Sequence, residues 1–194
     1  AGALFPTAKT VIDIGGQDAK VLRIDEGGRL ENFAMNDKCA AGTGRFLDVM
    51  AGVFQCRVSD LQEYDAKSTK VVSISSTCTV FAESEVISKL ASGEQIADIV
   101  AGIHESVAER TAGLAKRVGI VGDVAMTGGV ALNAGLRGRL SRKIGHSILV
   151  SNLSQLNGAL GASLVARDAF FSGMGAEDVA EARREKPTMC EGCR

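Results

Sequence analysis

Three short runs of strand-forming residues, separated by glycine turns, open the sequence and limit the folds that it can adopt. The first run, residues 9–14 (KTVIDI), ends at the pair Gly15–Gly16. Residues 18–25 (DAKVLRID) and residues 29–34 follow, with a second glycine turn between them. Turns this short join neighbouring antiparallel strands. We therefore predict that the chain begins with a three-stranded antiparallel unit.

Helices and strands alternate through the rest of the sequence. The apolar spacing indicates a long amphipathic helix over residues 96–118, in which Gly113 is a candidate break. The resulting order, β-β-β-α-β-α-α-β-α-β-α, predicts an α/β fold in which helices flank a mixed sheet. Further helices are predicted over residues 42–51, 133–140 and 156–170, and another opens within residues 76–83 and continues to about Leu90. Residues 55–70 are predicted to form a short helix and a connection, and further strands are predicted at 71–75, 123–126 and 146–150.

The composition excludes several classes of function. The net charge is −1 and aromatic residues make up 4% of the chain, which disfavours nucleic acid or an anionic membrane as a partner. No apolar run is long enough to span a membrane, and no signal peptide is visible. The odd number of cysteines, five, argues against a secreted disulfide scaffold. We therefore expect a cytoplasmic protein whose cysteines serve metal or redox chemistry.

The glycine pair after the first strand is a candidate phosphate site. Glycine lets backbone N–H groups approach an anion closely. Asp13 could hold a hydrated Mg²⁺, and Gln17 could orient a water molecule against a phosphate. The same residues, with Gly15 and Gly16, would also make a simple hairpin turn, and the motif alone does not separate the two interpretations.

A second strand, at residues 123–126, also ends in a glycine pair, Gly128–Gly129, which precedes Asn133 and a helix. One such pair is usually a packing feature. Two in one α/β chain are better explained together, as two sides of a nucleotide cleft at the strand ends.

Cys39 and Cys78 each precede a predicted helix, and a helix N-terminus favours a thiolate. A buried structural cysteine is the simpler interpretation of either residue alone. Two ligands are too few for a tetrahedral metal site or a cluster, which needs four. Unless Cys56 and the C-terminal tail contribute, a second copy must supply the others, so we predict a thiolate cluster that bridges a homodimer.

The remaining candidates have simpler interpretations. The C-x-x-C pair of Cys190 and Cys193 could be half of a zinc or iron–sulfur site, a dithiol, or a tail without a specific role. Structural roles are predicted for Cys56, His104 and His146, and a solvated helix face for Arg137, Arg139, Arg142 and Lys143.

Five stretches of the chain resemble a known family. They are VIDIGGQDAK, NDKCAAGTGRF, SSTCTVFAESEV, MTGGVALN and QLNGALGA, and they span most of residues 10–166. The family comprises the ATP-dependent activators of 2-hydroxyacyl-CoA dehydratases and the related ATPase subunits of benzoyl-CoA reductases. It belongs to the actin, sugar-kinase and heat-shock ATPase superfamily. The resemblance implies a ribonuclease H-like lobe over residues 1–171 with a cluster-ligating insertion at about 36–92, and residues 172–194 form an appended polar tail.

The resemblance also implies the chemistry. A homodimer would hold one four-iron four-sulfur cluster through Cys39 and Cys78 of each subunit. Asp13 would hold Mg²⁺ through water, with Gly15 to Gln17 near the phosphates of ATP or ADP. ATP hydrolysis would turn the subunits about the cluster. An electron from reduced ferredoxin or flavodoxin would then pass into the dehydratase or reductase component.

The matching adenosine motif would place Gly128, Gly129 and Asn133 near the nucleoside. No Asp-x-Gly-Ser-type stretch precedes residue 9, so the N-terminal lobe with the first phosphate motif is expected to be missing. The sequence therefore does not assign ATP hydrolysis to this chain alone. A sugar-kinase-like or regulatory ATP-binding module without a cluster is the alternative, and an interaction subunit that needs a separate N-terminal lobe is a third.

Overall fold

A five-stranded mixed sheet is the frame of the chain in the computed structural model, which describes residues 1–75 and 78–173. The strand order is β3-β2-β1-β4-β5. The first three strands are antiparallel, whereas β4 lies parallel to both β1 and β5. The predicted mixed sheet is thus confirmed. The strands are β1 (Ala8–Ile14), β2 (Ala19–Ile24), β3 (Leu30–Asn36), β4 (Asp123–Thr127) and β5 (Ile148–Leu149).

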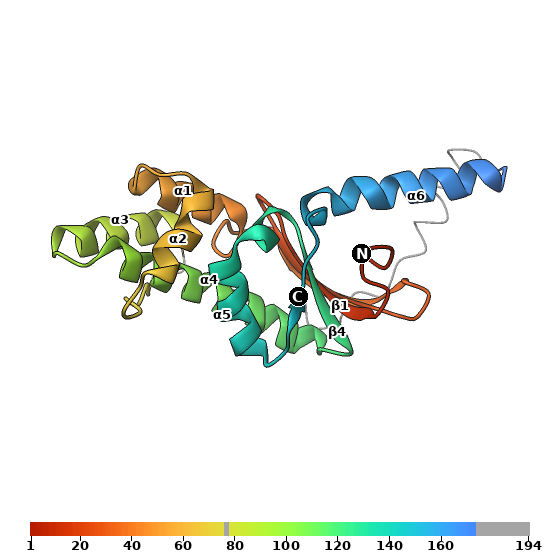
Figure 1. Ribbon diagram of the computed structural model, residues 1–194, viewed down its shortest axis with the longest axis horizontal. Coiled ribbons are helices and arrows are strands. Elements are labelled where there is room, and N and C mark those ends of the chain that lie inside the picture. The colour runs from red at the N-terminus through yellow and green to blue at the C-terminus, as the bar shows by residue number, and fades with distance from the viewer. Residues whose placement is uncertain (76–77, 174–194) are drawn as a thin grey trace.

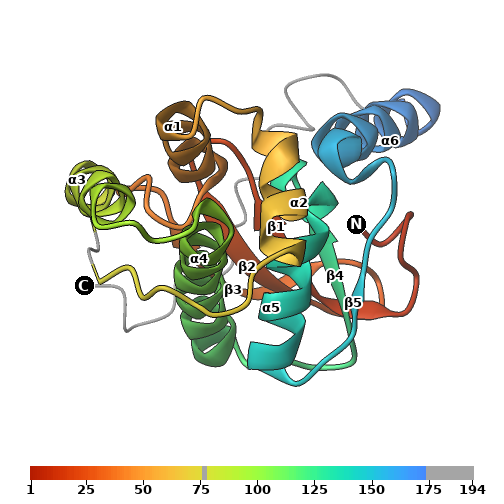
Figure 2. The same cartoon turned by 60° about the vertical axis from the view of Figure 1, so that its left-hand side comes forward.

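Two helices, α4 (Ile96–Val118) and α5 (Ala134–Ile144), cover one face of this sheet (Figures 1 and 2). Alternate residues of a strand point to opposite faces. Ile12 and Val21 point toward α4 and are fully buried, as is Ile103 of that helix. The alternate positions of the same strands face the other way and line a cleft. The core therefore lies on one side of the sheet, and the other side is available for a site.

Four helical segments lie between β3 and α4 and form a group beside the sheet (Figure 1). α1 packs against α3, and α2 packs against α4 and α5. On α1 the buried side chains Phe46, Leu47 and Met50 have helical spacing, which explains why this stretch forms a helix. The segments are α1 (Gly44–Val53), the 3₁₀ turn η1 (Val58–Asp60), α2 (Leu61–Ala66) and α3 (Thr79–Ala91).

The end of the described chain leaves the body of the molecule. After the 3₁₀ turns η2 (Gly129–Leu132) and η3 (Ser154–Leu156), helix α6 (Asn157–Phe171) points away from the sheet (Figure 1). None of its side chains is buried. No helix in residues 1–75 and 78–173 has the length and apolar character that crossing a membrane requires.

Two predictions about secondary structure were wrong. Residues 71–75 do not join the sheet, because they run along α4. The Val72 N–H donates to the carbonyl of Asp98 at 3.1 Å, and a Cβ added to Gly102 would lie 1.7 Å from the Val72 oxygen. Helix α4 also continues without a break through Gly113. The pair Cys190 and Cys193 lies outside the described residues.

Candidate functional site

The two predicted glycine turns line a single cleft of about 970 Å³. Strands β1 and β4 are parallel, with Asp13 paired to Thr127, so their carboxyl ends and the turns that follow lie side by side. The opposite wall comes from α1, η1 and α2, through Asp48, Ser59 and Gln62. Of the site residues predicted from sequence, the cleft is lined by Asp13, Gly15, Gly16, Gly128, Gly129 and Asn133.

Asp13 is held in position by groups from two neighbouring strands. The Thr127 hydroxyl donates to Asp13 Oδ1 at 2.6 Å, and Lys20 Nζ lies 3.9 Å from Oδ2. Lys20 also pairs with Asp18 at 2.7 Å. Because the Asp13 side chain is 28% exposed toward the cleft, its oxygens can reach a hydrated cation of the Mg²⁺ kind. Sequence reasoning did not single out Lys20 or Thr127, whose roles follow from strand register.

The glycines of the cleft serve different purposes. Gly128 has a φ of 85°, and a Cβ there would lie 2.2 Å from the carbonyl oxygen of Ile14, so packing alone requires glycine. A Cβ at Gly16 would meet nothing within 4 Å, so its backbone is open to a ligand. The Gly15 N–H donates to the Asp18 carbonyl at 3.0 Å, which closes the hairpin turn. Gln17 is exposed and is not among the residues that line the cleft.

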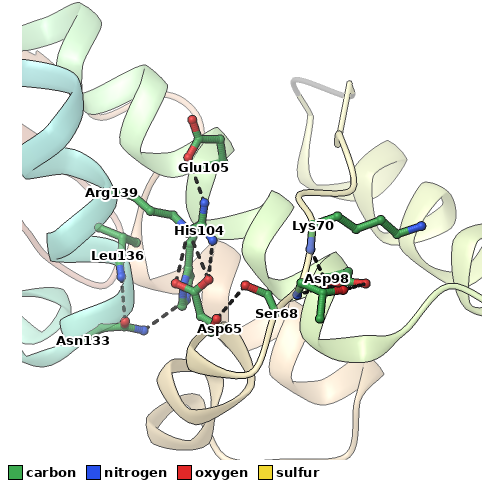
Figure 3. A network of polar contacts seen from close by, with 10 residues as sticks. Asp65, Ser68, Lys70, Asp98, His104, Glu105, Asn133, Leu136 and Arg139 are labelled. Carbon is green, nitrogen blue, oxygen red and sulfur yellow. Dashed lines mark hydrogen bonds and ion pairs between the residues drawn. The ribbon is translucent and has the colours of Figure 1, made fainter.

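Asn133 connects the cleft to the buried side chain of His104 (Figure 3). Its Oδ1 accepts the Leu136 N–H at 3.0 Å and caps α5, which fixes the orientation of the amide. Its Nδ2 lies 3.1 Å from His104 Nε2. An amide nitrogen can only donate, so Nε2 accepts, and His104 Nδ1 carries the proton that bonds Asp65 at 3.0 Å.

Asp65 is the centre of this network, which ties α2 to α4 and α5 (Figure 3). The Arg139 guanidinium donates to its carboxylate at 2.6 Å and also to Glu105 at 3.1 Å. Burial raises the pKa of Asp65, but the hydrogen bonds from His104 and Arg139 outweigh it and hold that pKa at about 2. Arg139 was predicted to lie on a solvated face; it is buried instead, because Asp65 pairs with it.

The loop that carries Cys39 has a defined shape. The Asn36 amide donates to the carbonyls of Cys39 at 2.9 Å and Ala41 at 3.0 Å. The buried Thr43 hydroxyl donates to the Ala40 carbonyl at 2.7 Å. These bonds hold the loop while Cys39 itself is exposed. The thiol is therefore presented at the surface by a loop that side chains on both sides fix.

The first turn of α1 is bonded directly to the glycine turn of the cleft. The Gly44 N–H donates to the Gly15 carbonyl at 2.8 Å, and the Arg45 N–H donates to the Gly16 carbonyl at 2.7 Å. A Cβ at Gly44 would lie 3.0 Å from the Gly15 oxygen, so the two backbones touch. The sequence predicted that the free N–H groups of this helix would favour a thiolate at Cys39. Two of these groups are committed to the glycine turn instead.

Cys78 is the N-cap residue of α3 and is half-buried. Helix α3 packs on α1, so the helices that follow the two predicted ligands are neighbours. Cys56 packs against the core, and burial, assisted by Asp60, raises the pKa of its thiol, which makes it a poor thiolate ligand. No group of three or more metal-binding side chains occurs in the part of the chain that the structure describes. Cys39 and Cys78 are thiolate donors of the kind that a four-thiolate cluster takes, and two of them are half of the number that it needs.

Comparison with known proteins identifies the relatives of this chain. The model of the BadF/BadG/BcrA/BcrD ATPase family matches residues 1–166. The (R)-2-hydroxyglutaryl-CoA dehydratase activating ATPase of Acidaminococcus fermentans is 64% identical over 86% of this chain and 64% of its own length. A benzoyl-CoA reductase subunit of Thauera aromatica is 35% identical over 93% of this chain and 68% of its own length.

Solved structures agree with these relatives. Component A of the Acidaminococcus fermentans (R)-2-hydroxyglutaryl-CoA dehydratase superposes with a TM-score of 0.81 at 63% identity, over 84% of this chain and 62% of that one. The activator of the Clostridium difficile 2-hydroxyisocaproyl-CoA dehydratase, solved with bound ADPNP, gives 0.82 at 53% identity, over 96% and 66%. The predicted ribonuclease H-like lobe of an actin-type ATPase is thereby confirmed. The chain spans slightly less than two thirds of the dehydratase activators that it matches.

Proposed function

The chain belongs to the BadF/BadG/BcrA/BcrD ATPase family, and on that basis we propose that it is the cluster-bearing, nucleotide-binding lobe of an ATP-driven activator. The target would be a 2-hydroxyacyl-CoA dehydratase or benzoyl-CoA reductase component. One observation carries the proposal. The Gly15–Gly16 turn of the cleft is hydrogen-bonded to the first residues of the helix that follows Cys39. The proposed nucleotide site and the proposed thiolate site would therefore be joined by these backbone hydrogen bonds.

The cleft is proposed to bind ATP or ADP with Mg²⁺. Asp13 would hold the cation through water, because Thr127 and Lys20 fix its carboxylate at the strand end. Gly16 would approach the phosphates with its open backbone. Gln17 lies outside the lining of the cleft, so its side chain would have to turn toward the phosphates to orient the attacking water. The relative from Clostridium difficile was solved with bound ADPNP, which supports a nucleotide here.

The nucleoside is proposed to lie against the turn that follows β4. Gly128 and Gly129 line the cleft there, and their lack of side chains leaves backbone for the sugar to contact. The Asn133 side chain is engaged with Leu136 and His104, so it acts as a positioning residue that fixes the turn.

Cys39 and Cys78 are proposed to ligate one four-iron four-sulfur cluster together with the same residues of a second copy. A cluster held there supplies low-potential one-electron chemistry. Reduced ferredoxin or flavodoxin would give the electron, and the dehydratase or reductase component would receive it. Within the described residues one chain offers two such ligands, which is the reason to expect a homodimer with an isologous interface. Oxygen-sensitive chemistry of this kind suits an anaerobic cytoplasm.

Helix α1 is proposed to transmit the state of the nucleotide to the Cys39 loop. Hydrolysis converts ATP and water into ADP and phosphate, which removes the γ-phosphate contact from the Gly15–Gly16 turn. Because Gly44 and Arg45 are bonded to that turn, a shift of the turn moves the start of α1. The Cys39 loop ends at this helix, so the thiolate moves with it.

Iron analysis of cysteine variants tests the proposal. After anaerobic reconstitution with iron and sulfide, the dimer should hold about two iron atoms per chain, since four are shared by two copies. Cys39→Ala and Cys78→Ala should each abolish iron binding. The matched control, Cys56→Ala, should leave it intact because this thiol packs on the core. A colourless unmodified protein that binds nucleotide and phosphorylates a sugar would refute the proposal in favour of a kinase-like module.

A further inference from the structure

A second cleft, of about 410 Å³, is lined in part by the Cys39 loop, through Cys39, Ala41 and Gly42. Its walls are the loop, the start of β2, the end of β3 and the C-terminal half of α4. None of its residues lines the nucleotide cleft. We call this cleft the arginine groove, because Arg110 and Arg117 are, besides Cys39, the ionisable side chains among the described residues that line it.

The two arginines have no partner in the part of the chain that the structure describes. Neither side chain makes a hydrogen bond or ion pair there, although the side chains of Arg139 and Lys143 are both paired with carboxylates. Arg110 and Arg117 are seven positions apart on α4, so both lie on the face of the helix that borders the groove. The groove therefore presents positive charge that nothing in the described chain neutralises.

The position of Arg110 is fixed relative to the Cys39 loop. Gly42 has a φ of 90°, and the Arg110 Cδ atom lies 3.3 Å from where a Cβ of Gly42 would be. The aliphatic part of the arginine thus supports the loop, which leaves the guanidinium at the groove. Asp37 and Lys38, which precede Cys39, cancel in formal charge. The arginines consequently set the sign of the electrostatic potential beside the thiol.

We propose that the arginine groove docks an acidic surface of the protein that delivers electrons to the cluster, with carboxylates of that protein pairing with Arg110 and Arg117. The inference rests on the proposed function and adds the place and charge of the donor. Guanidinium groups bind carboxylates in a bidentate geometry. Short-lived redox complexes use small interfaces, and opposite charges accelerate their encounter. A donor docked here would lie against the loop that carries Cys39.

The helix that follows Cys78 offers a contrasting surface. Val80, Phe81 and Ile87 of α3 are 66%, 67% and 51% exposed. This apolar face is unsuited to an acidic, transient partner. The charged and apolar surfaces lie beside different cysteines, so the arginine groove is the surface that charge complementarity assigns to the electron donor.

A charge-reversal experiment tests the docking site in the reconstituted dimer. The rate of cluster reduction by a reduced, acidic flavodoxin is measured by stopped flow at several salt concentrations. The double variant Arg110→Glu/Arg117→Glu should be about tenfold slower or more at low salt, and its dependence on salt should be lost. The control is Lys116→Glu, an exposed residue of the same helix outside the groove, whose rate should stay within about twofold, since a lone surface charge contributes little.

Three further readouts separate the outcomes. Iron content and nucleotide affinity should be unchanged in the double variant, and reduction by the small cation methyl viologen radical should be no slower, because the added negative charge attracts a cation. Slower reduction by methyl viologen would overturn the docking site, because the arginines would then act on the cluster. Equal flavodoxin rates in the double variant and the unmodified protein would also overturn it. An unmodified protein that assembles no cluster would refute the proposed function instead.

Discussion

At the scale of single residues, Asp65 shows how much of the site depends on contacts that are distant in sequence. Its carboxylate bonds His104 and Arg139, which lie 39 and 74 positions further along the chain. The sequence indicated a structural role for His104, which is buried in this network, but it gave no sign that Arg139 would be buried. Charge spacing within one helix shows which side chains share a face, and it does not show which distant carboxylate meets that face.

The low pKa of Asp65 predicts a loss of stability in acid. Its folded value of about 2 lies below the ordinary 3.8, so between these values the unfolded state binds the proton and the folded state does not. Asp65 should therefore contribute about 2 kcal/mol to the free energy of unfolding above pH 4. This contribution is lost as the pH falls toward 2. Urea unfolding at a series of pH values should show that, below pH 4, the free energy of unfolding falls more steeply with decreasing pH in the unmodified protein than in Asp65→Asn. We call this dependence the acid slope.

Asp25→Asn is the control for this measurement. Asp25 is half-exposed and bonds only the local backbone of its turn, so its removal should leave the acid slope unchanged. The same slope in the unmodified protein and in Asp65→Asn would contradict the assignment of Asp65 as the centre of the network.

At the scale of elements, the contact between α1 and the Gly15–Gly16 turn is the feature with the clearest consequence. A Cβ at Gly44 would lie 3.0 Å from the Gly15 oxygen and 3.2 Å from the Gly16 Cα, so Gly44→Ala must push the turn and the helix apart. We expect this variant to weaken ADPNP binding by about tenfold, equivalent to about 1.4 kcal/mol. Titration calorimetry measures the effect.

Gly52→Ala is a matched control on the same helix. A Cβ there would meet nothing within 4 Å, so the substitution should leave ADPNP affinity unchanged. The substitution should only raise the free energy of unfolding, by about 0.5–1 kcal/mol, because alanine has a higher helix propensity than glycine. Equal affinities in both variants and the unmodified protein would show that the turn does not contact the nucleotide.

The segment at residues 71–75 shows why one element could not be predicted. Its β-branched residues suit either a strand or an extended segment on a helix, because both bury alternate side chains. Val72 and Ile74 are buried, as in a strand. What decides between the two is Gly102, whose missing side chain lets the backbone of this segment reach α4. Gly102 lies some thirty positions away from this segment in the sequence, so the pattern of residues 71–75 alone cannot predict the outcome.

At the scale of the whole molecule, the features that could be predicted are those that depend on residues close together in the sequence. The order of the first three strands, the two glycine turns and the helices after Cys39 and Cys78 were all predicted from short stretches. Both turns line one cleft because β1 and β4 pair in parallel, which places the turns that follow these strands side by side. The opposite wall of the cleft could not be predicted, because it comes from the helical group between β3 and α4.

The nucleotide cleft and the thiolate site are proposed to be coupled through α1. The most direct test is the EPR spectrum of the reduced, reconstituted dimer with and without MgATP. The spectrum should change on nucleotide binding, because a shift of the Gly15–Gly16 turn moves the helix that follows Cys39. Identical spectra in a protein that equilibrium dialysis shows to have bound the nucleotide would contradict it.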